Sequence, residues 1–559
     1  MVKKYTADFE TTTNLEDIRI WAYGICEIGD PENFIYGTDM EEFMGWCSEG
    51  NPIIYFHNLK FDGMYIIDWL ERNGFTYSEE KRNKTYNCII SKAGQFYQIE
   101  VIFEKKSKRT RKVTFYDSFK KLSFSVDKVA KAFKLPLNKL EIDYKKERPV
   151  GYKLTDHEID YLRADVEIMA RALEIQFDKG LTKMTTGSDA LHNFKEMMGE
   201  KEFKRTFPVL KVDIDKDIRQ AYRGGFTYLN EKYKGKDVSE GIVLDVHSMY
   251  PGVMYNKYLP FGKPLLFRGK YKKDNIYTLY IQMFTCEFKL KDGKIPTVQL
   301  KNNLAYQPTD YVKESKEPTT LCMTNIDVDL FFDHYEVKNI EWHSGWKFKA
   351  TKGIFKDYID YWYKVKEENS KEKGALYNLA KLMLNALYGK FATNPDVTGK
   401  YPVMENNKIK LKMKKEKEMR DPVYTAMGVF ITSYARDLVI RSAQSVYPRF
   451  IYADTDSLHL EGKEIPKEIT VTDNKLGTWG FETSFERGRF IRAKTYIEEI
   501  YDEEKDKLKL KVTCAGMPDR VKEKVTWDNF RSGLKLDGKL VPKVGAGGVI
   551  LEDTTFTIK

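Results

Sequence analysis

The feature that most constrains this chain is a pair of acidic residues between two short apolar segments. Residues 450–453 and 457–460 favour β-strands, and Asp454-Thr455-Asp456 lies between them. The pattern predicts a hairpin with two carboxylates at its turn. Two such charges about 4 Å apart repel each other by roughly 4 kcal/mol at an effective dielectric constant near 20. Water can relieve this repulsion at an exposed Asx-type turn, or a bound cation can relieve it at a buried one. The apolar flanks favour the metal-binding hairpin, which then needs further ligands elsewhere in the chain.

The composition describes a large globular protein. A chain of 559 residues divides into several domains, and 42% hydrophobic and 14% aromatic residues supply their cores. The net charge of +10 fits a phosphate-bearing partner but supports it only weakly. Six scattered cysteines without a C-x-x-C pair argue for a reducing compartment and against zinc or disulfides. The first ten residues leave no room for a signal peptide, and no apolar run approaches the ~18 residues of a membrane span, so we expect a soluble intracellular protein.

Four more acids lie on three predicted elements in the first third of the chain. Asp8 and Glu10 share one face of an alternating strand. Asp62 follows a strand-to-helix junction, and Asp165 lies on a helix that opens with a capping box. Hard cations such as Mg²⁺ or Mn²⁺ take oxygen ligands, and two of them can clamp a phosphodiester during its displacement. The sequence therefore predicts a two-metal nuclease site.

Three motifs around these acids resemble the exonuclease motifs of DnaQ-type proofreading domains. They are D-F-E from Asp8, N-x-x-x-F-D from Asn58 and Y-x-x-x-D from Tyr161, in the family's order and spacing. Tyr161 lies one helical turn before Asp165, where it could orient the attacking water. Lys139 matches a family lysine thought to assist this site. The same resemblance implies contacts with single-stranded DNA, partly by stacking, from His57, Asn58, Phe61, Ser118 and Phe119.

A basic hairpin tip is expected at residues 105–112, between two strand-like segments. Its six positive charges suit either a solvated turn or a nucleic-acid backbone, and the sequence leaves both interpretations open.

A second acidic centre is predicted in the remaining two-thirds. Asp245 ends an apolar strand that begins at Gly241, and the segment S-M-Y-P follows it. As a local pattern this is also compatible with a strand capped by an Asx turn. Asp245 is nevertheless the further carboxylate that Asp454 and Asp456 require. Two metal ions on Asp245 and Asp456 would activate a 3′-hydroxyl and hold an incoming triphosphate.

A polar stripe is predicted on a helix that begins near Gly374. Lys381, Asn385 and Tyr388 fall at positions i, i+4 and i+7 of that helix. The lysine can neutralise phosphates as a point charge, and the tyrosine offers a face for a base to stack on. The alternative is an ordinary solvated face.

Together these segments resemble family B DNA polymerases. D-x-x-S-M-Y-P from Asp245, K-x-x-x-N-x-x-Y-G from Lys381, Y-A-D-T-D-S from Tyr452 and K-T-Y from Lys494 are similar to the family's A, B, C and K-x-Y motifs. The resemblance to the phi29-type protein-primed phage polymerases covers essentially the whole chain. Its further signs are Y-R-G-G at 222–225, N-P-D-V-T-G-K from 394, C-A-G-M from 514 and the closing T-F-T-I-K.

The resemblance implies an α/β multidomain fold. It combines an RNase H-like (DnaQ-type) 3′–5′ exonuclease domain with a right-hand polymerase that carries two family-specific insertions. The implied divisions are an exonuclease domain at 1–185, palm at 186–256, a first insertion at 257–354, fingers at 355–392, a second insertion at 393–420, palm at 421–513 and thumb at 514–559. The first insertion is implied to hold the terminal protein that primes synthesis. The second is implied to close a ring round DNA and to give processivity and strand displacement. Lysines alternate with apolar residues from 408 onward, which predicts a hairpin with one cationic face.

The resemblance also implies residue roles. Asp456 and Asp245 bind the metals with Asp454 assisting, and Tyr250 lies under the sugar and excludes a 2′-hydroxyl. The implied nucleotide-binding set is Val246, Tyr250, Lys381, Asn385 and Tyr388. The implied polymerase-side DNA contacts are Tyr222, Arg223, Gly224, Gly225, Lys494 and Tyr496. The implied metal ligands, for two Mg²⁺ or Mn²⁺ ions per site, are Asp8, Glu10, Asp62, Asp165, Asp245, Val246 and Asp456.

Three departures from the family pattern stand out. Met249 replaces a more usual leucine, a volume-conserving change. Tyr377 stands where a lysine is expected, which leaves a DNA or primer-protein contact in question. Residues 501–511 are shorter than the family's hairpin.

The resulting expectation is a phage-encoded, DNA-directed DNA polymerase with a 3′–5′ exonuclease. Its partners would be template and primer DNA, deoxynucleoside triphosphates and a terminal protein, as a monomer or a 1:1 heterodimer, in the cytoplasm of a bacterial host. A repair exonuclease with a degenerate polymerase is disfavoured by the intact acids at Asp245, Asp454 and Asp456. A catalytically silent scaffold would leave all the motif acids unexplained.

Overall fold

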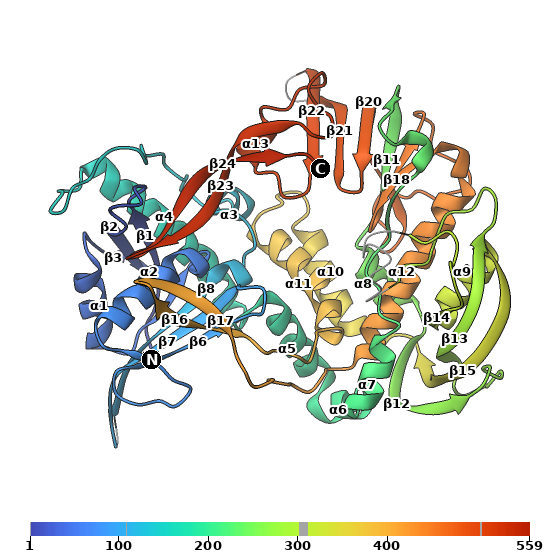
Figure 1. Cartoon of the computed structure of the whole chain (residues 1–559), viewed down its shortest axis with the longest axis horizontal. Helices are drawn as coiled ribbons and strands as arrows, with labels where there is room; N and C mark the ends of the chain where they lie inside the picture. The colour runs from blue at the N-terminus through green and yellow to red at the C-terminus, as the bar shows by residue number, and fades with distance from the viewer. Residues whose placement is uncertain (1, 108, 301–310, 503–505) are drawn as a thin grey trace.

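The computed structural model describes residues 2–107, 109–300, 311–502 and 506–559. Two large sheets, a smaller sheet and a long C-terminal hairpin are joined by helices that pack between and around them (Figure 1). None of the helices in these ranges has the length and apolar character needed to cross a bilayer.

The N-terminal sheet has ten strands and carries the first acidic set. Its order is β17 (Lys408–Met413), β16 (Lys400–Glu405), β6 (Thr85–Ile90), β7 (Phe96–Lys106), β8 (Arg109–Asp117), β4 (Ile53–Phe56), β1 (Lys4–Thr11), β2 (Ile20–Glu27) and β3 (Asp30–Gly37), with β5 (Thr76–Tyr77) beside β6. The helices of this region are α1 (Met40–Glu49), α2 (Leu59–Arg72), α3 (Val126–Phe133) and α4 (Asp156–Asp178), with the short η1 (Ser118–Lys120).

The local predictions for this region are confirmed. β1 pairs with β2 as a hairpin partner, and β4 leads into α2, which ends at Arg72. Helix α4 begins with the expected capping box, in which Thr155 and Glu158 satisfy each other's backbone N–H groups. The basic tip lies between the paired strands β7 and β8, and Lys108 within it falls outside the described residues.

The second insertion is part of the N-terminal sheet. β16 and β17 form the predicted hairpin, and β16 meets β6 where Lys400 lies opposite Ile90. On β17 the lysines point outward while Ile409 is buried in the N-terminal core. Figure 1 shows this orange hairpin alongside the blue sheet, although some three hundred residues separate them in the chain.

The central sheet has eight strands and carries the second acidic set. Its order is β22 (Lys507–Cys514), β21 (Thr495–Asp502), β20 (Trp479–Arg492), β11 (Gly241–Val246), β19 (Ser457–Glu461), β18 (Phe450–Asp454) and β9 (Thr227–Leu229), with β10 (Asp237–Val238) beside β20. Helices and turns between and around its strands are α5 (Thr186–Met198), α6 (Glu200–Thr206), α7 (Val212–Arg219), η2 (Glu231–Tyr233), α8 (Met249–Asn256), α10 (Lys356–Glu368), α11 (Ala375–Phe391), α12 (Thr425–Ser445) and η3 (Tyr447–Arg449).

The two faces of the central sheet bury different residues. Ile242, Leu244 and Val246 alternate along β11 into the large core shared with the helices. Val243 and Tyr452 point the other way, into an aromatic cluster with rings from β20 and β21. Because side chains alternate with period two, the acids that follow these residues by two positions are directed to the aromatic face.

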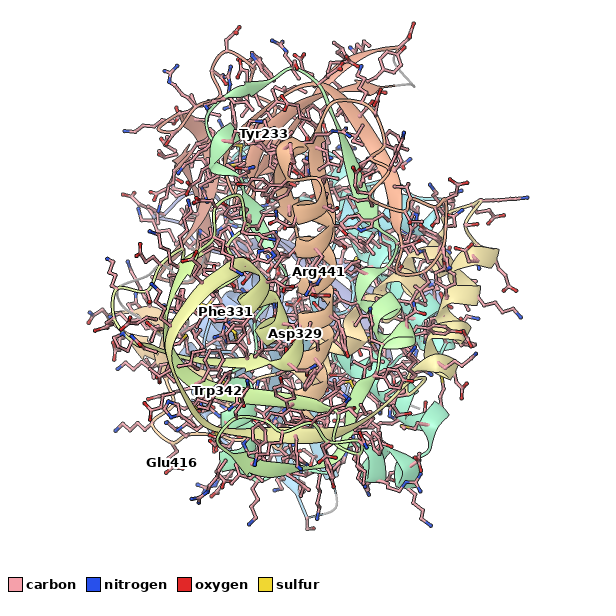
Figure 2. The ribbon with its side chains drawn as sticks, turned by 90° about the vertical axis from the view of Figure 1, so that its right-hand side faces the viewer. Tyr233, Asp329, Phe331, Trp342, Glu416 and Arg441 are labelled. Atoms are coloured by element: carbon pink, nitrogen blue, oxygen red, sulfur yellow. The ribbon has the colours of Figure 1, made fainter. Side chains whose placement is uncertain are left out.

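The first insertion forms a four-stranded sheet of its own. Its order is β12 (Leu259–Arg268), β15 (Tyr335–Thr351), β13 (Leu279–Leu290) and β14 (Thr319–Thr324), with helix α9 (Asn325–His334), and residues 301–310 lie outside the described part. Figure 2 shows this sheet curving around α9, with α12 beside them. Asp327 of α9 pairs with Arg436 of α12 at 2.7 Å, so the insertion is fixed to the central helices.

The C-terminal hairpin extends from the central region to the N-terminal domain. β23 (Lys535–Gly545) and β24 (Gly548–Thr557) follow the short helix α13 (Asp519–Lys522), and Figure 1 shows them reaching α2. At the hairpin tip, the N–H of Gly547 donates to Asp68 at 3.2 Å. The Tyr65 hydroxyl donates to the carbonyl of Val549.

Candidate active sites

The acidic turn at Asp454-Thr455-Asp456 is tightly constrained. It joins β18 and β19 in the predicted hairpin, with Asp454 opposite Ser457. The Asp456 N–H donates to the Asp454 carbonyl at 2.7 Å, and Thr455 between them has a φ of 64°. An i to i+2 bond around a residue with positive φ is the rare, strained form of the γ-turn. Such strain persists only where the surroundings enforce it, and it clusters at functional sites.

Neighbouring strands hold this turn from both sides. The Thr455 N–H donates to the Phe226 carbonyl at 2.7 Å, and the Val246 N–H donates to the Asp456 carbonyl at 2.8 Å. The second bond links the turn to β11, where Asp245 lies opposite Ser457. The structure thus brings Asp245, Asp454 and Asp456 to one end of the central sheet.

Among the described residues, neither Asp245 nor Asp456 forms an ion pair, although Lys381 acts on both from a distance. Burial first, and then the charges of Asp456 and Glu482, raise the pKa of Asp245 to about 7, while Lys381 opposes the rise. Burial, Asp454 and Glu482 likewise raise the pKa of Asp456. Within the described chain, the Asp245 carboxylate forms no hydrogen bond or ion pair. A divalent cation bound by oxygen ligands would relieve this repulsion, so the residues present fit one.

Asp454 differs from its two neighbours. Lys494 donates to its carboxylate at 2.6 Å, Tyr452 at 3.1 Å and Thr227 at 3.2 Å. The charge of Asp454 is therefore already balanced within the protein. This difference supports the expected split into a ligand, Asp456, and an assisting residue.

The polar stripe of α11 faces this centre. Lys381 and Asn385 are exposed, and Lys381 lies close enough to lower the pKa values of both unpaired acids. The ring of Tyr388 stacks on that of Tyr250 from α8, with centroids 3.9 Å apart and planes 22° from parallel. Helix geometry thus brings motif B beside motif A.

The remaining polymerase-side residues contribute mainly backbone. The Val246 side chain is buried, so only its main chain can reach the centre. Arg223 donates to the carbonyls of Gln299, Gln220 and Tyr222, which occupies its guanidinium within the protein. Gly225 packs against the strained turn, since a Cβ there would lie 2.8 Å from Cγ2 of Thr455.

Two residues near this centre were missed from the sequence. Glu482 occupies a bulge of β20 and acts electrostatically on Asp245 and Asp456. Lys366 of α10 reaches the Ser248 hydroxyl at 3.4 Å, beside motif A. Neither belongs to a recognisable motif, because a bulge and a helix–strand approach arise only from tertiary contacts.

The departures from the family pattern lie away from the acids. Met249 is buried in the central core, consistent with a volume-conserving change. Tyr377 is half-buried on α11. Residues 501–502 and 506–511 belong to the β21–β22 hairpin, and 503–505 lie outside the described chain.

The first acidic set converges on the N-terminal sheet. Ligand oxygens of Asp8, Glu10 and Asp165 lie within 4.8 Å of one another. Burial, then the charge of Asp165, raises the pKa of Asp8 to about 7. Burial, then Asp8, raises the pKa of Asp62, which places the fourth acid at the same point. One buried oxygen of Asp165 has no hydrogen-bond partner within the described part of the chain, so this donor set also fits a divalent cation.

Lys139 and Tyr161 lie beside these acids. Lys139 Nζ donates to Asp165 at 2.5 Å and lies 5.4 Å from the centre of the Tyr161 ring. The hydroxyl of Tyr161 is hydrogen-bonded to that of Tyr144 at 2.8 Å, and Tyr144 was not predicted. Its only sequence signal is its position five residues after Lys139.

A cleft of about 1770 Å³ opens onto the four acids. His57, Asn58 and Phe61 line it, as expected for strand-binding residues. Three distant segments complete its wall. Their lining residues are Lys408, Ile409, Lys410 and Leu411 of β17, Arg520 of α13, and Leu540, Pro542, Val544, Val549, Ile550, Leu551, Glu552 and Asp553 of the C-terminal hairpin.

Ser118 and Phe119 do not line this cleft. Ser118 is fully buried, and its hydroxyl donates to the Phe56 carbonyl and contacts Nδ1 of His57, both at 3.1 Å. The other ring nitrogen of His57 bonds the Phe124 carbonyl at 2.7 Å. Phe119 is 37% exposed, with its ring 5.4 Å from that of His57. The Ser118 hydroxyl therefore holds the ring of His57, which does line the cleft.

Comparison with known proteins confirms the resemblance to the phi29-type phage polymerases. A family model described as DNA polymerase type B, organellar and viral, matches residues 47–475. The chain is 51% identical to the DNA polymerase of Bacillus phage B103, over 100% of both proteins. It is 49% identical to that of Bacillus phage phi29, over 100% of this chain and 99% of that protein. It is 33% identical to the DNA polymerase of Streptococcus phage Cp-1, over 99% of this chain and 98% of that protein.

Solved structures agree with the sequence comparison. The phi29 DNA polymerase complexed with primer-template DNA and incoming nucleotides superposes with a TM-score of 0.96 at 49% identity, over 100% of both chains. The same polymerase complexed with single-stranded DNA superposes with a TM-score of 0.95 at 48% identity, also over 100% of both chains. The predicted α/β multidomain fold, with exonuclease and polymerase parts, is confirmed by this match. The chain therefore belongs to the organellar and viral type B DNA polymerases, among the phi29-like phage enzymes.

Proposed function

We propose that this protein copies DNA by nucleotidyl transfer at the central sheet and removes mismatched 3′ ends at the N-terminal sheet. The observation that carries the proposal is the presence of two separate acidic centres, each with carboxylates left without enough positive charge. The relatives complexed with primer-template DNA, nucleotides and single-stranded DNA support the same substrates for this chain.

Each centre would hold two Mg²⁺ or Mn²⁺ ions. Asp245 and Asp456, with the main chain of Val246, would serve the central site, and the ligands of the N-terminal site would be Asp8, Glu10, Asp62 and Asp165. When bound, these ions neutralise the phosphate and stabilise the attacking and leaving oxygens.

In the central site the protein's own groups position the reactants. Lys381 binds the triphosphate as a point charge, and Asn385 lies one turn further along the same exposed stripe. The stacked pair Tyr250 and Tyr388 forms the nucleotide pocket, where Tyr250 excludes a 2′-hydroxyl by contact with the sugar. Lys494, anchored to Asp454, holds the primer terminus.

Further contacts with DNA on this side come from two segments. Tyr496 supports the primer end from β21. The loop at 222–225 contributes through Tyr222 and through backbone at Gly224 and Gly225, and Arg223 acts by bracing that loop.

In the N-terminal site, Tyr161 orients the attacking water through its hydroxyl, and Lys139 balances the charge of Asp165. His57, Asn58 and Phe61 hold the frayed strand in the cleft, and Phe119 offers a partly exposed ring beside His57. We assign Ser118 a positioning role through His57.

We further propose that synthesis begins on a protein hydroxyl. Similarity to the phi29-type enzymes over the full chain supports a terminal protein as partner, in a 1:1 complex with an otherwise monomeric enzyme. The sheet at 257–354 would hold that protein, and the β16–β17 hairpin would help to enclose DNA for processive, strand-displacing synthesis. Phage relatives support activity in the cytoplasm of a bacterial host.

Separation of the two activities tests the proposal. Asp456→Ala should abolish primer extension with Mg²⁺ and leave degradation of single strands near normal. Asp8→Ala combined with Glu10→Ala should do the reverse. Loss of both activities in either folded variant would contradict a two-centre enzyme.

Priming needs its own assay. Incubation with Mg²⁺, labelled dATP and a purified candidate terminal protein should yield a covalent protein–dAMP adduct. The adduct should be absent with Asp456→Ala and present with the nuclease-deficient variant. A polymerase that extends DNA primers but never forms the adduct with its cognate protein would exclude protein priming.

A further inference from the structure

A fully buried pair of polar side chains lies behind the polymerase centre and takes no part in the proposed chemistry. His459 on β19 is 2% exposed and Glu498 on β21 is 0% exposed. Nδ1 of the histidine donates to Oε1 of the glutamate at 2.6 Å. The second oxygen of Glu498 has no hydrogen-bond partner among the described residues, and Lys511 lies 3.9 Å from it. Burying two such groups is costly unless they are paired and hydrogen-bonded, as these two are with each other.

The pair connects strands that are not neighbours. β20 and β11 lie between β21 and β19 in the central sheet. With about 4.8 Å between adjacent strands, a flat sheet would separate them by roughly 14 Å. The contact is possible because the sheet curls and because Gly488, opposite Glu498, has no side chain. A Cβ at Gly488 would lie 2.9 Å from the Phe490 ring.

The histidine of this bridge lies between two functional segments, the acidic turn and the K-T-Y segment. His459 lies opposite Tyr452, whose hydroxyl donates to Asp454 at 3.1 Å and accepts from the Lys494 N–H at 2.9 Å. On the other side, the His459 ring lies 5.1 Å from that of Tyr496. The bridge thus sets the spacing between the acidic turn and the K-T-Y segment.

We propose that His459 and Glu498 are positioning residues that hold Lys494 and Tyr496 at the primer terminus. They touch no substrate and act through the rings of Tyr452 and Tyr496. The inference rests on the proposed role of the K-T-Y segment in primer binding. It predicts an effect chiefly on the primer, because the side chains proposed to hold the nucleotide, Tyr250, Lys381 and Tyr388, lie on α8 and α11, which the bridge does not join.

The test compares apolar and conservative variants of the full-length enzyme. His459→Phe combined with Glu498→Leu removes the bridge without leaving an unpaired buried charge. It should raise the KM for primer-template about tenfold, the effect of losing one hydrogen bond to a charged group, and change the KM for dATP less than about twofold. Glu498→Gln keeps an acceptor for the histidine, and His459→Asn keeps a donor near Nδ1; both should stay within about twofold of wild type.

The outcomes separate this inference from the proposed function. A wild-type enzyme that fails to extend a primed template would remove the proposed function itself. If wild type is active and the folded double variant has an unchanged KM for primer-template, only the positioning role of the bridge would be overturned. Equal increases in both KM values would overturn it too, since they would indicate general damage. If the double variant does not fold, Glu498→Ala, which removes the acceptor, should raise the primer KM about tenfold relative to Glu498→Gln, which keeps it. Equal primer KM values for these two variants would overturn the bridge.

Discussion

Carboxylates that share a site without a cation raise one another's pKa, and single residues in both centres show this effect. The pKa values of Asp8 and Asp245 each rise from a usual value near 3.8 to about 7. Burial is the main cause, and the charge of a neighbouring acid is the second. Asp454 differs from them in having a cationic partner, since Lys494 lies 2.6 Å from its carboxylate. The contrast separates the acids proposed to bind a metal ion from the one whose charge a lysine already balances.

Folding without metal should therefore depend on pH. In the native state Asp8 and Asp245 keep their protons up to about pH 7, whereas in the unfolded chain they lose them near pH 4. The native state binds more protons in that window, so stability in EDTA should fall as the pH rises from about 4 to 7. Asp8→Asn should remove part of the loss and be more stable than wild type at pH 7.5 by a few kcal/mol, since each pKa unit is worth about 1.4 kcal/mol.

Thermal melting in EDTA and in Mg²⁺ measures this effect. Mg²⁺ should restore the stability of wild type at pH 7.5 and help Asp8→Asn less. The exposed Asp160, on the same domain, provides the control Asp160→Asn, which should follow wild type at every pH. If the melting temperatures of wild type and Asp8→Asn in EDTA fell in parallel as the pH rises, titration of Asp8 would not be the cause of the loss of stability.

At the scale of elements, the strained turn between β18 and β19 depends on the chain segment packed against it. Thr455 donates its N–H to Phe226, and Gly225 lies directly against its side chain. The Y-R-G-G loop and the acidic turn are some 230 residues apart in sequence, yet they form one unit.

A single added methyl group should disturb this unit. In Gly225→Ala the new Cβ would lie 2.8 Å from Thr455, and relieving that overlap must shift either the loop or the turn. Overpacking of this kind costs about 1–3 kcal/mol, so primer extension should fall about tenfold while degradation of single strands stays normal. Gly45→Ala on α1 is the control, because no atom lies within 4 Å of its added Cβ and the residue belongs to neither proposed site. Equal activities of the two variants would rule out the packing role.

Several elements were predictable from local patterns. The acidic hairpin, the strand-to-helix junction before Asp62 and the capping box of α4 each depend on residues close in sequence. Other features were not predictable. Burial of Ser118, the bulge at Glu482 and the approach of Lys366 to Ser248 each require a contact between distant segments. Single-sequence periodicity carries no information about such contacts.

At the scale of the whole molecule, the cleft of the N-terminal site is a joint product of regions far apart in the chain. The N-terminal domain supplies the acids, β17 supplies Lys408 and Lys410, and α13 supplies Arg520. The C-terminal hairpin closes it by docking on α2. A strand that enters this cleft would meet all of these regions at once.

Salt dependence should reveal the lysines of β17. Replacing Lys408 and Lys410 by Gln removes two positive charges from the cleft wall. For single strands, each phosphate contact contributes about −0.7 to the slope of log K against log salt, so the slope should become shallower by about 1.4. The measurement is binding of a single-stranded oligonucleotide without metal. Lys412→Gln is the control, since Lys412 pairs with Glu405 as Lys410 does but does not line the cleft. An identical slope for all three proteins would exclude a strand contact at these lysines.

The sequence by itself predicted the chemistry that is proposed for this protein. Acids at Asp8, Asp62, Asp245 and Asp456 occur in motifs whose spacing follows from the geometry of strands, helices and turns, so their residue types and order predict two metal-dependent centres. Only the tertiary structure decided how each centre is supported. Lys494 balances Asp454, the buried His459 and Glu498 bridge a curled sheet, and the C-terminal hairpin completes a cleft begun 500 residues earlier. The physical reason is that motifs record local backbone geometry, whereas charge balance and enclosure depend on which distant surfaces fold together.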